Sequence, residues 1–362
     1  MNTYNNSISK LKGYDLYFIN ISLWKQNTIK KMFIDSNVFF IKHEDIRKIE
    51  QVSNTKIIIW GINNLKKINS EYPDYKFTII EDGFIRSKSL GSDLAEPLSL
   101  ILDEDGIYFD PRTKSGLESL ISDYKLTMED KKIGNEIKNK ILKDNISKYN
   151  ISSNIESDYY SKHKNNTIKV IIGQVEDDAS IIFGSNNIKT NLDLIKEVFK
   201  NKNTNDILVY KPHPDVTSGN RVGKVNIKEV LKYCDHVDNK TPIINILKYS
   251  NIEVHTITSL TGFENVLRGN KTICYGNPFY SGWGFTTDIC MPEYIKIRRG
   301  VVSLDDFFTY SYIKYPIYYN NLTKELSTAD DIIEIIKHSK ELNINLYLKL
   351  KRKIINILTR LK

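Results

Sequence analysis

Short apolar runs alternate along the chain with amphipathic stretches, and this alternation decides the predicted fold. In the first half we expect strands at 15–19, 38–41, 56–60, 76–80, 98–102 and 106–109, and helices at 117–122 and 128–145. In the second half we expect strands at 168–173, 206–210, 252–255 and 271–275, with helices at 192–200, 243–249 and 260–267. Strands that alternate with helices favour parallel sheets, so the pattern predicts two doubly wound α/β domains.

A polar stretch from Asn145 to Thr167 separates the two blocks and predicts a domain boundary. We expect an N-terminal domain at residues 1–150, a C-terminal domain at 166–330 and a helical segment at 331–362. The length of 362 residues suits two cores better than one. Ligands of open parallel sheets bind beyond the carboxyl ends of the strands, so the cleft between the domains is the expected site.

The C-terminal segment is basic and amphipathic. Residues 349–362 contain no acid, and one helical face carries Leu346, Leu350, Ile354, Ile357 and Leu361. Such a helix binds an anionic membrane surface, or it packs its apolar stripe on the body of the protein. The spacing alone leaves both interpretations open.

The composition excludes several classes of protein. The formal net charge is +8, but the charge outside the C-terminal segment is balanced and no nucleic-acid-binding motif occurs, so no nucleic-acid partner is expected. Three cysteines without metal spacing fit a reducing cytosol and give no structural zinc site. The start of the chain lacks the pattern of a signal peptide, and no run approaches the ~20 apolar residues of a spanning helix. We expect a soluble or peripheral protein.

The first polar group at a strand end is Glu81-Asp82-Gly83, followed by Arg86. Adjacent carboxylates serve as a general base or hold a ligand, and arginine suits a bidentate contact with a carboxylate. The alternative is a turn with capping acids and a surface arginine.

The second group follows the strand that ends at Gly173, where Glu176, Asp177 and Asp178 precede Ser180. Three carboxylates in one short turn disfavour each other's ionisation, which is typical of tuned catalytic groups. They would also suit an acidic metal site, an interpretation we disfavour, and loops with capping acids are the common alternative.

The third group, KPHPD, holds His213 between two prolines that fix the course of the loop. With Lys211 and Arg221 it forms a predicted phosphate-binding cluster. The alternative for a lone histidine is a structural or exposed position.

The fourth group is the segment 251–288, in which a strand leads into a hydroxyl-rich helix start and then into the Gly-rich sequence PFYSGWG. Ser259 and Thr261 suit a phosphate, and Glu264 would reach ribose hydroxyls. Tyr280 and Trp283 would stack on a sugar. The alternatives are a solvated helix glutamate and a core tryptophan.

Five strings in this order resemble the bacterial capsule proteins of the KpsC type, between about Lys56 and Tyr318. They are EDGFIRSKSLGSDLAEPLSLILDEDGIYFD, GQVEDDASI, YKPHPDV with GNR, HTITSLTGFENVLRG and GNPFYSGWGFTTD. Members of that family are retaining β-Kdo glycosyltransferases that use CMP-Kdo. The resemblance implies a GT-B-like fold, in which two Rossmann-type domains enclose the active site in the cleft between them.

The resemblance also implies roles for individual residues. Asp178 matches the catalytic aspartate and would be the nucleophile, Glu81 or Asp82 would be the base, and Arg86 would hold a substrate carboxylate. The residues expected to bind the CMP-sugar are Gln174, Ser180, Lys211, His213, Pro214, Arg221, Ser259, Leu260, Thr261, Gly262, Glu264, Tyr280, Gly282 and Trp283. Neither a metal nor another cofactor is expected.

The implied function is transfer of Kdo from CMP-β-Kdo to a lipid-linked glycan or phospholipid in capsule or surface polysaccharide biosynthesis. The full-length capsule enzyme resembles two such modules, whereas each motif occurs once here, so we expect one active site. The alternatives are that it adds a single Kdo linkage, that it works beside a partner transferase, or that it uses a different acceptor such as a lipopolysaccharide or glycan terminus. The expected place is the cytoplasm, or the anionic cytoplasmic face of the inner membrane. The alternatives are a sialyltransferase-like enzyme that uses CMP-sialic acid and a non-catalytic protein of capsule assembly or export.

Overall fold

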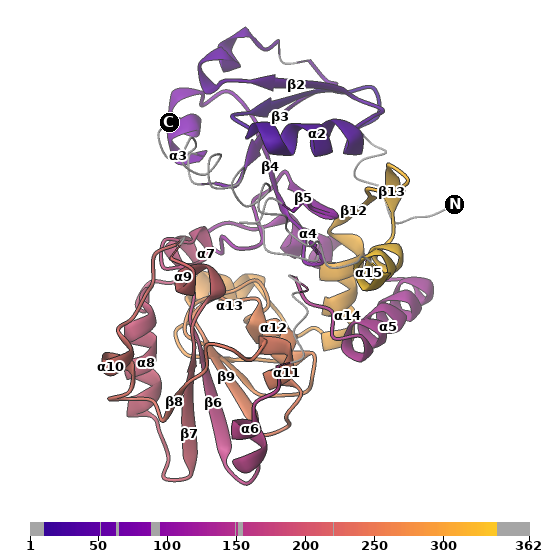
Figure 1. Ribbon diagram of the computed structural model, residues 1–362. Coiled ribbons are helices and arrows are strands. Elements are labelled where there is room, and N and C mark those ends of the chain that lie inside the picture. The colour runs from indigo at the N-terminus through magenta and orange to yellow at the C-terminus, as the bar shows by residue number, and fades with distance from the viewer. Residues whose placement is uncertain are drawn as a thin grey trace, which may run out of the picture.

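The computed structural model describes residues 11–50, 52–62, 65–87, 95–148, 150, 155–219 and 221–338, and these form a mixed α/β fold with two sheets. Figure 1 shows one sheet in the upper part of the molecule and the other in the lower part. The amphipathic C-terminal stretch after residue 338, with its predicted membrane contact, lies outside the described residues.

The first sheet has seven strands in the order β13-β12-β5-β4-β3-β1-β2. Their bounds are β1 Asp15–Ile19, β2 Asn37–Ile41, β3 Thr55–Trp60, β4 Phe77–Asp82, β5 Ser99–Asp103, β12 Ile317–Asn320 and β13 Glu325–Ser327. Strands β2, β1, β3 and β4 are parallel, as predicted, but β5, β12 and β13 are antiparallel to their neighbours. The prediction of a purely parallel sheet is wrong here, because antiparallel neighbours need no crossover helix. The predicted strand at 106–109 is also wrong, since a turn forms there instead.

Strands β12 and β13 come from the far end of the described chain. Ile317 pairs with Leu100 of β5, and the buried Tyr319 belongs to the core of the first sheet. Residues 317–327, which lie inside the predicted range 166–330, thus contribute two strands to the first sheet. Pairing with β5 covers an apolar strand edge that would otherwise be open.

The second sheet has six parallel strands in the order β11-β10-β9-β6-β7-β8, and it matches the predicted doubly wound pattern. The bounds are β6 Thr167–Ile172, β7 Asp206–Lys211, β8 His236–Val237, β9 Ile252–Thr256, β10 Thr272–Cys274 and β11 Thr287–Asp288. The central strands are buried on both faces, as their continuous apolar runs predict.

Helices flank both sheets. The α-helices are α2 Leu23–Met32, α3 Leu65–Glu71, α4 Gly116–Asp123, α5 Met128–Lys143, α6 Asp158–Lys162, α7 Ala179–Gly184, α8 Asn191–Lys200, α9 Pro214–Thr217, α10 Ile227–Val230, α11 Ile243–Leu247, α12 Thr261–Val266, α13 Glu293–Arg298, α14 Leu304–Phe308 and α15 Ala329–His338. A 3-10 helix covers His43–Lys48 and a π-helix covers Thr309–Lys314. No helix in the described part of the chain is both long and apolar enough to span a membrane.

One apolar core extends across both halves of the molecule. Phe84, which follows β4, stacks on Phe279, which follows β10, with ring centroids 4.7 Å apart. Phe84 also stacks on Tyr312 of the π-helix at 5.2 Å. Stacked aromatic pairs of this kind add to the free energy gained by burying the rings. The two sheets are thus fixed to each other by shared packing.

A buried ion pair crosses the same junction. Glu118, which completes the capping box of α4, accepts a hydrogen bond from Nε of Arg299 at 2.6 Å. Both side chains belong to residues that are 4% exposed. Nη1 of Arg299 also donates to the carbonyl oxygens of Pro278 and Ser281, at 2.8 and 3.1 Å. Arg299 therefore ties α4 to the loop after β10.

We expect Arg299→Met to lower the free energy of unfolding by about 3 kcal/mol or more, because it removes the closer of two arginines from the buried Glu118 carboxylate and leaves only Arg298, at 3.2 Å. Thermal and urea unfolding would measure the change. The matched control is Lys200→Met, which removes an exposed ion pair with Glu197 (2.8 Å) and should cost less than about 1 kcal/mol. Equal losses in the two variants would contradict a special role of the buried pair.

Candidate functional site

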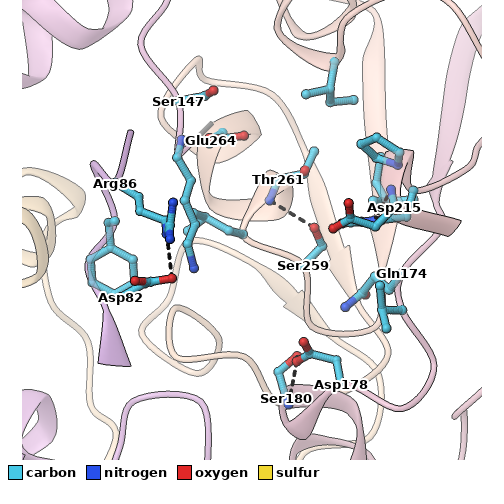
Figure 2. Close-up of a pocket in the computed structure, with 18 of the residues that line it drawn as sticks. Asp82, Arg86, Ser147, Gln174, Asp178, Ser180, Asp215, Ser259, Thr261 and Glu264 are labelled. Atoms are coloured by element: carbon cyan, nitrogen blue, oxygen red, sulfur yellow. Dashed lines mark hydrogen bonds and ion pairs between the residues drawn. The ribbon is translucent and has the colours of Figure 1, made fainter. Parts of the chain in front are cut away.

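A pocket of about 1390 Å³ opens at the carboxyl ends of the parallel strands of both sheets. Trp60 and Gly61 follow β3, Glu81 and Asp82 end β4, and Gln174 follows β6 in its wall. Figure 2 shows Asp82 and Arg86 on one side of the close-up, with Asp178, Ser259 and Asp215 on the other. The pocket lies where parallel strand ends are expected to bind ligands.

Most of the predicted site residues line this pocket. They are Glu81, Asp82, Arg86, Gln174, Asp178, Ser180, Lys211, His213, Pro214, Arg221, Ser259, Leu260, Thr261 and Glu264. The four that do not line it are Gly262, Tyr280, Gly282 and Trp283.

Tyr280 and Trp283 belong to the core and cannot stack on a sugar in this structure, so that prediction is wrong. They are 0% and 2% exposed. The Tyr280 hydroxyl donates to the carbonyl oxygen of Ser259 at 2.5 Å, and Nε1 of Trp283 donates to that of Phe279 at 2.9 Å. Gly262 packs against Tyr280, where a Cβ would lie 2.1 Å from the hydroxyl oxygen. Tyr280 thus supports the Ser259 turn from the core.

Asp178 occupies the N-cap position of α7 and faces the pocket. Its Oδ1 accepts hydrogen bonds from the backbone N–H and the hydroxyl of Ser180, at 2.9 and 2.7 Å. The cap fixes the carboxylate at the mouth of a helix and leaves its second oxygen outside these two bonds. The sequence-predicted pair Asp178 and Ser180 is therefore one unit.

The neighbouring acids bond to different partners than Asp178 does, although Asp177 lines the same pocket. The carboxylate of Glu176 accepts from the backbone N–H of Asn191 at 2.7 Å, and Asp177 pairs with Arg221 at 3.1 Å. Across the described ranges, no group of three His, Cys, Asp or Glu side chains is placed to hold a metal ion. The three carboxylates thus take separate partners, unlike the clustered arrangement that the sequence suggested.

A chain of hydrogen bonds holds this wall together. Nε2 of Gln174 donates to Oγ1 of Thr258 at 3.1 Å, while its Oε1 accepts from the backbone N–H of Thr258 at 2.9 Å. Thr258 Oγ1 lies 3.1 Å from the hydroxyl of Ser180. Both ends of the Gln174 amide are thus used to connect β6, α7 and the turn after β9. Sequence reasoning missed Thr258, although the hydroxyl-rich turn was its signal.

His213 caps α9 through its ring. Nδ1 accepts a hydrogen bond from the backbone N–H of Asp215 at 3.1 Å, so the ring proton is on Nε2. Burial lowers the pKa of His213, although Asp215 and Asp178 act in the opposite direction. The ring is therefore neutral at pH 7 and offers Nε2–H to a ligand. Nearby, burial lowers the pKa of Lys211, whose Nζ donates to the carbonyl oxygen of Asp238 at 3.0 Å.

The first-sheet wall carries a different pair of carboxylates. Oδ2 of Asp82 accepts from Nε of Arg86 at 2.6 Å, and this arginine is only 1% exposed. Oε1 of Glu81 accepts from the backbone N–H of Asp82 at 2.9 Å. Burial and the neighbouring Asp82 raise the pKa of Glu81, opposed by Lys25 and Lys148. Since Asp82 is committed to Arg86, Glu81 is the better proton acceptor of the two.

The connector between the halves also enters the pocket. The backbone N–H of Lys148 donates to Oε1 of Glu264 at 3.4 Å, and burial raises the pKa of Glu264. Sequence reasoning treated residues 145–167 as a linker and assigned Lys148 no role. It also assigned no role to Lys25 and Trp60, which line the first-sheet wall.

Comparison with solved structures supports the fold. The β-Kdo 2,7 transferase KpsC of Thermosulfurimonas dismutans superimposes with a TM-score of 0.71 at 31% identity, covering 89% of this chain and 98% of that chain. The β-Kdo 2,4 transferase of the same organism gives a TM-score of 0.73 at 24% identity, over 88% of this chain and 97% of that chain.

Sequence relatives have names that refer to surface polysaccharides. The capsule polysaccharide modification protein LipA of Neisseria meningitidis serogroup B is 36% identical over 93% of this chain and 47% of its own length. The lipopolysaccharide-processing protein LpsZ of Rhizobium meliloti is 34% identical over 82% of this chain and 68% of its length. The chain spans about half the length of LipA. Residues 55–318 match the family described as capsule polysaccharide biosynthesis protein, and the chain belongs to this family.

Proposed function

We propose that the protein is a retaining glycosyltransferase that transfers Kdo from CMP-β-Kdo to a glycan or lipid acceptor in surface polysaccharide biosynthesis. The observation that carries the proposal is that Asp178, after β6, and Glu81, at the end of β4, line one pocket together with Lys211, His213 and Arg221, the predicted phosphate-binding cluster. Support for the sugar comes from the likeness to the solved β-Kdo 2,7 transferase.

The second-sheet wall is proposed to hold the CMP part. Ser259, Thr261 and Nε2–H of His213 would donate to the phosphate, and Arg221 would add positive charge. Such fixed donors stabilise a departing phosphate without solvent reorganisation. Glu264 is proposed to accept from the ribose hydroxyls. Gln174 acts indirectly, since its amide already bonds Thr258 at both ends.

The proposed chemistry is a double displacement. Departure of CMP leaves an oxocarbenium-like anomeric carbon next to the Kdo carboxylate, and the Asp178 carboxylate forms an ester bond with that carbon. The acceptor oxygen then bonds to the same carbon, the ester bond breaks, and the acceptor proton passes to Glu81. Two inversions give net retention of configuration. Arg86 would act mainly by holding Asp82 away from this proton transfer.

A lipid-linked glycan or a phospholipid would enter along the first-sheet wall, and a partner transferase would add any second type of linkage. Association with an anionic cytoplasmic membrane surface through residues 349–362 remains a prediction from the sequence.

The decisive assay measures CMP release from CMP-Kdo, and in parallel from CMP-sialic acid, with a Kdo glycoside or phosphatidylglycerol as acceptor. We expect release with CMP-Kdo only, and a product of retained configuration. Release with CMP-sialic acid alone would favour a sialyltransferase. No release from either donor with these acceptors would favour a non-catalytic role in capsule assembly.

The nucleophile is tested with Asp178→Asn, because asparagine still caps α7 but cannot form the ester bond. We expect the rate of transfer to fall by roughly 10³-fold or more. The dissociation constant for CMP, measured by calorimetry, should stay near that of the wild type. Normal turnover by this variant would remove Asp178 from the mechanism.

The role of His213 is tested with two isosteres. Glutamine places an N–H near the position of Nε2, whereas asparagine replaces only the capping Nδ1. We expect His213→Asn to fold normally but to weaken CMP binding by roughly tenfold, since one hydrogen bond to a charged group is lost. His213→Gln should retain more of the affinity. Equal affinities in both variants would show that Nε2–H does not contact the nucleotide.

A further inference from the structure

A lysine that no motif indicated lies on the first-sheet wall. Lys25 belongs to α2 and lines the pocket beside Trp24 and Trp60. Its Nζ lies 3.2 Å from the centroid of the Trp60 ring and 5.4 Å from that of Trp24. A cation over an indole face is attracted by the negative charge of the ring, and tryptophan is the best partner for this contact. The ammonium is thus fixed in place by an aromatic ring.

Glu81 lies beside the turn that Trp60 and Gly61 form after β3. Trp60 pairs with Ile80 across β3 and β4, so Glu81 is the next residue along that strand. Gly61 follows Trp60 with φ +65°, and a Cβ there would lie 3.6 Å from Oε2 of Glu81. The sheet therefore places the Glu81 carboxylate next to the Trp60-Gly61 turn that carries Lys25 on its indole.

The charged groups around Glu81 come from three elements. Asp82 of β4 acts against a negative charge on Glu81, as does burial. Lys25 of α2 and Lys148 of the connector favour that charge, and Lys25 has the larger effect. Arg86 is paired with Asp82 at 2.6 Å. A nearby cation therefore favours the ionised form of Glu81, which is the form that can accept a proton.

Lys25 keeps its positive charge at neutral pH. Burial lowers its pKa to about 8, while Asp82 and Glu81 act to raise it and Arg86 acts to lower it. The indole face of Trp60 cannot accept a proton, so the Lys25 ammonium does not lose its proton to that ring. It acts on Glu81 through its field.

We propose that Lys25 is a positioning residue of the transfer reaction: fixed over Trp60, its ammonium favours the ionised form of Glu81, the form that accepts the proton of the acceptor hydroxyl. This inference rests on the proposed function, in which the acceptor oxygen bonds to the anomeric carbon and its proton passes to Glu81. Lys25 itself takes no proton in that step. The effect of Lys25 is on the pH above which Glu81 is able to accept that proton.

The first experiment follows the pH dependence of Kdo transfer from CMP-Kdo to a Kdo glycoside. In Lys25→Met we expect the acidic limb of the kcat profile to move to higher pH by about one unit, because Glu81 loses an opposite charge. The KM for CMP-Kdo should not change. Lys25→Arg should restore the wild-type limb. Lys30→Met, an exposed lysine of the same helix that does not line the pocket, is the control.

A uniform loss of kcat at all pH values in Lys25→Met, without movement of the limb, would overturn the proposal and indicate a purely structural role. Failure of Lys25→Arg to restore the limb would also contradict it, since the charge would then not be the property that matters.

The second experiment needs no substrate. The emission of Trp60 should respond to the ammonium above its ring, so wild-type fluorescence should show a titration with a midpoint near pH 8 that is absent in Lys25→Met. Electrostatic coupling is reciprocal, so Glu81→Gln should lower that midpoint by about one unit. An unchanged midpoint in Glu81→Gln, or no Lys25-dependent titration, would overturn the pairing. Absence of CMP release from wild-type protein would instead refute the proposed function and leave this result standing.

Discussion

Phe84 stacks on Phe279 at the centre of a core to which both halves of the chain contribute, and the pocket above depends on this contact. Each sheet alone would present only one wall. The shared aromatic packing brings the carboxyl ends of two sets of parallel strands to face each other, and the buried Glu118–Arg299 pair holds the same junction from the side. The returning strand β12 adds a second covalent passage between the halves. A junction built in this way limits relative motion, so the two walls are largely preformed.

The two walls treat their carboxylates differently, and the proposed division of labour follows from that. Asp178 accepts two hydrogen bonds at a helix N-cap, and these bonds fix the direction of the carboxylate that is proposed to attack. Glu81 lies where burial and Asp82 favour its protonated form, so its readiness to accept a proton depends on the cations around it. Pairs of titratable groups in contrasting environments are typical of acid–base and nucleophilic partners. Two side chains with the same carboxylate chemistry are thus proposed to take different roles because their surroundings differ.

The sequence predicted those elements whose formation depends mainly on neighbouring residues along the chain. Continuous apolar runs gave β6, β7 and β9, and the polar residues after them were correctly expected at one edge of the sheet. The prediction that Tyr280 and Trp283 are exposed was wrong. Glycines around an aromatic residue suggest exposure, but Phe263 packs against Tyr280 and Phe307 packs against Trp283. Lys25 was missed for a related reason. Only the pairing of β1, β3 and β4 brings α2 beside Glu81, more than fifty residues away in sequence.

Some relatives are longer than this chain. The chain covers nearly all of the solved β-Kdo 2,7 transferase chain but about half of LipA, so longer relatives contain additional sequence. Both walls of the pocket described here come from residues of this one chain, including the nucleophile candidate, the base candidate and the cation beside it. Each residue role in the proposed double displacement is assigned to a side chain that lines this pocket.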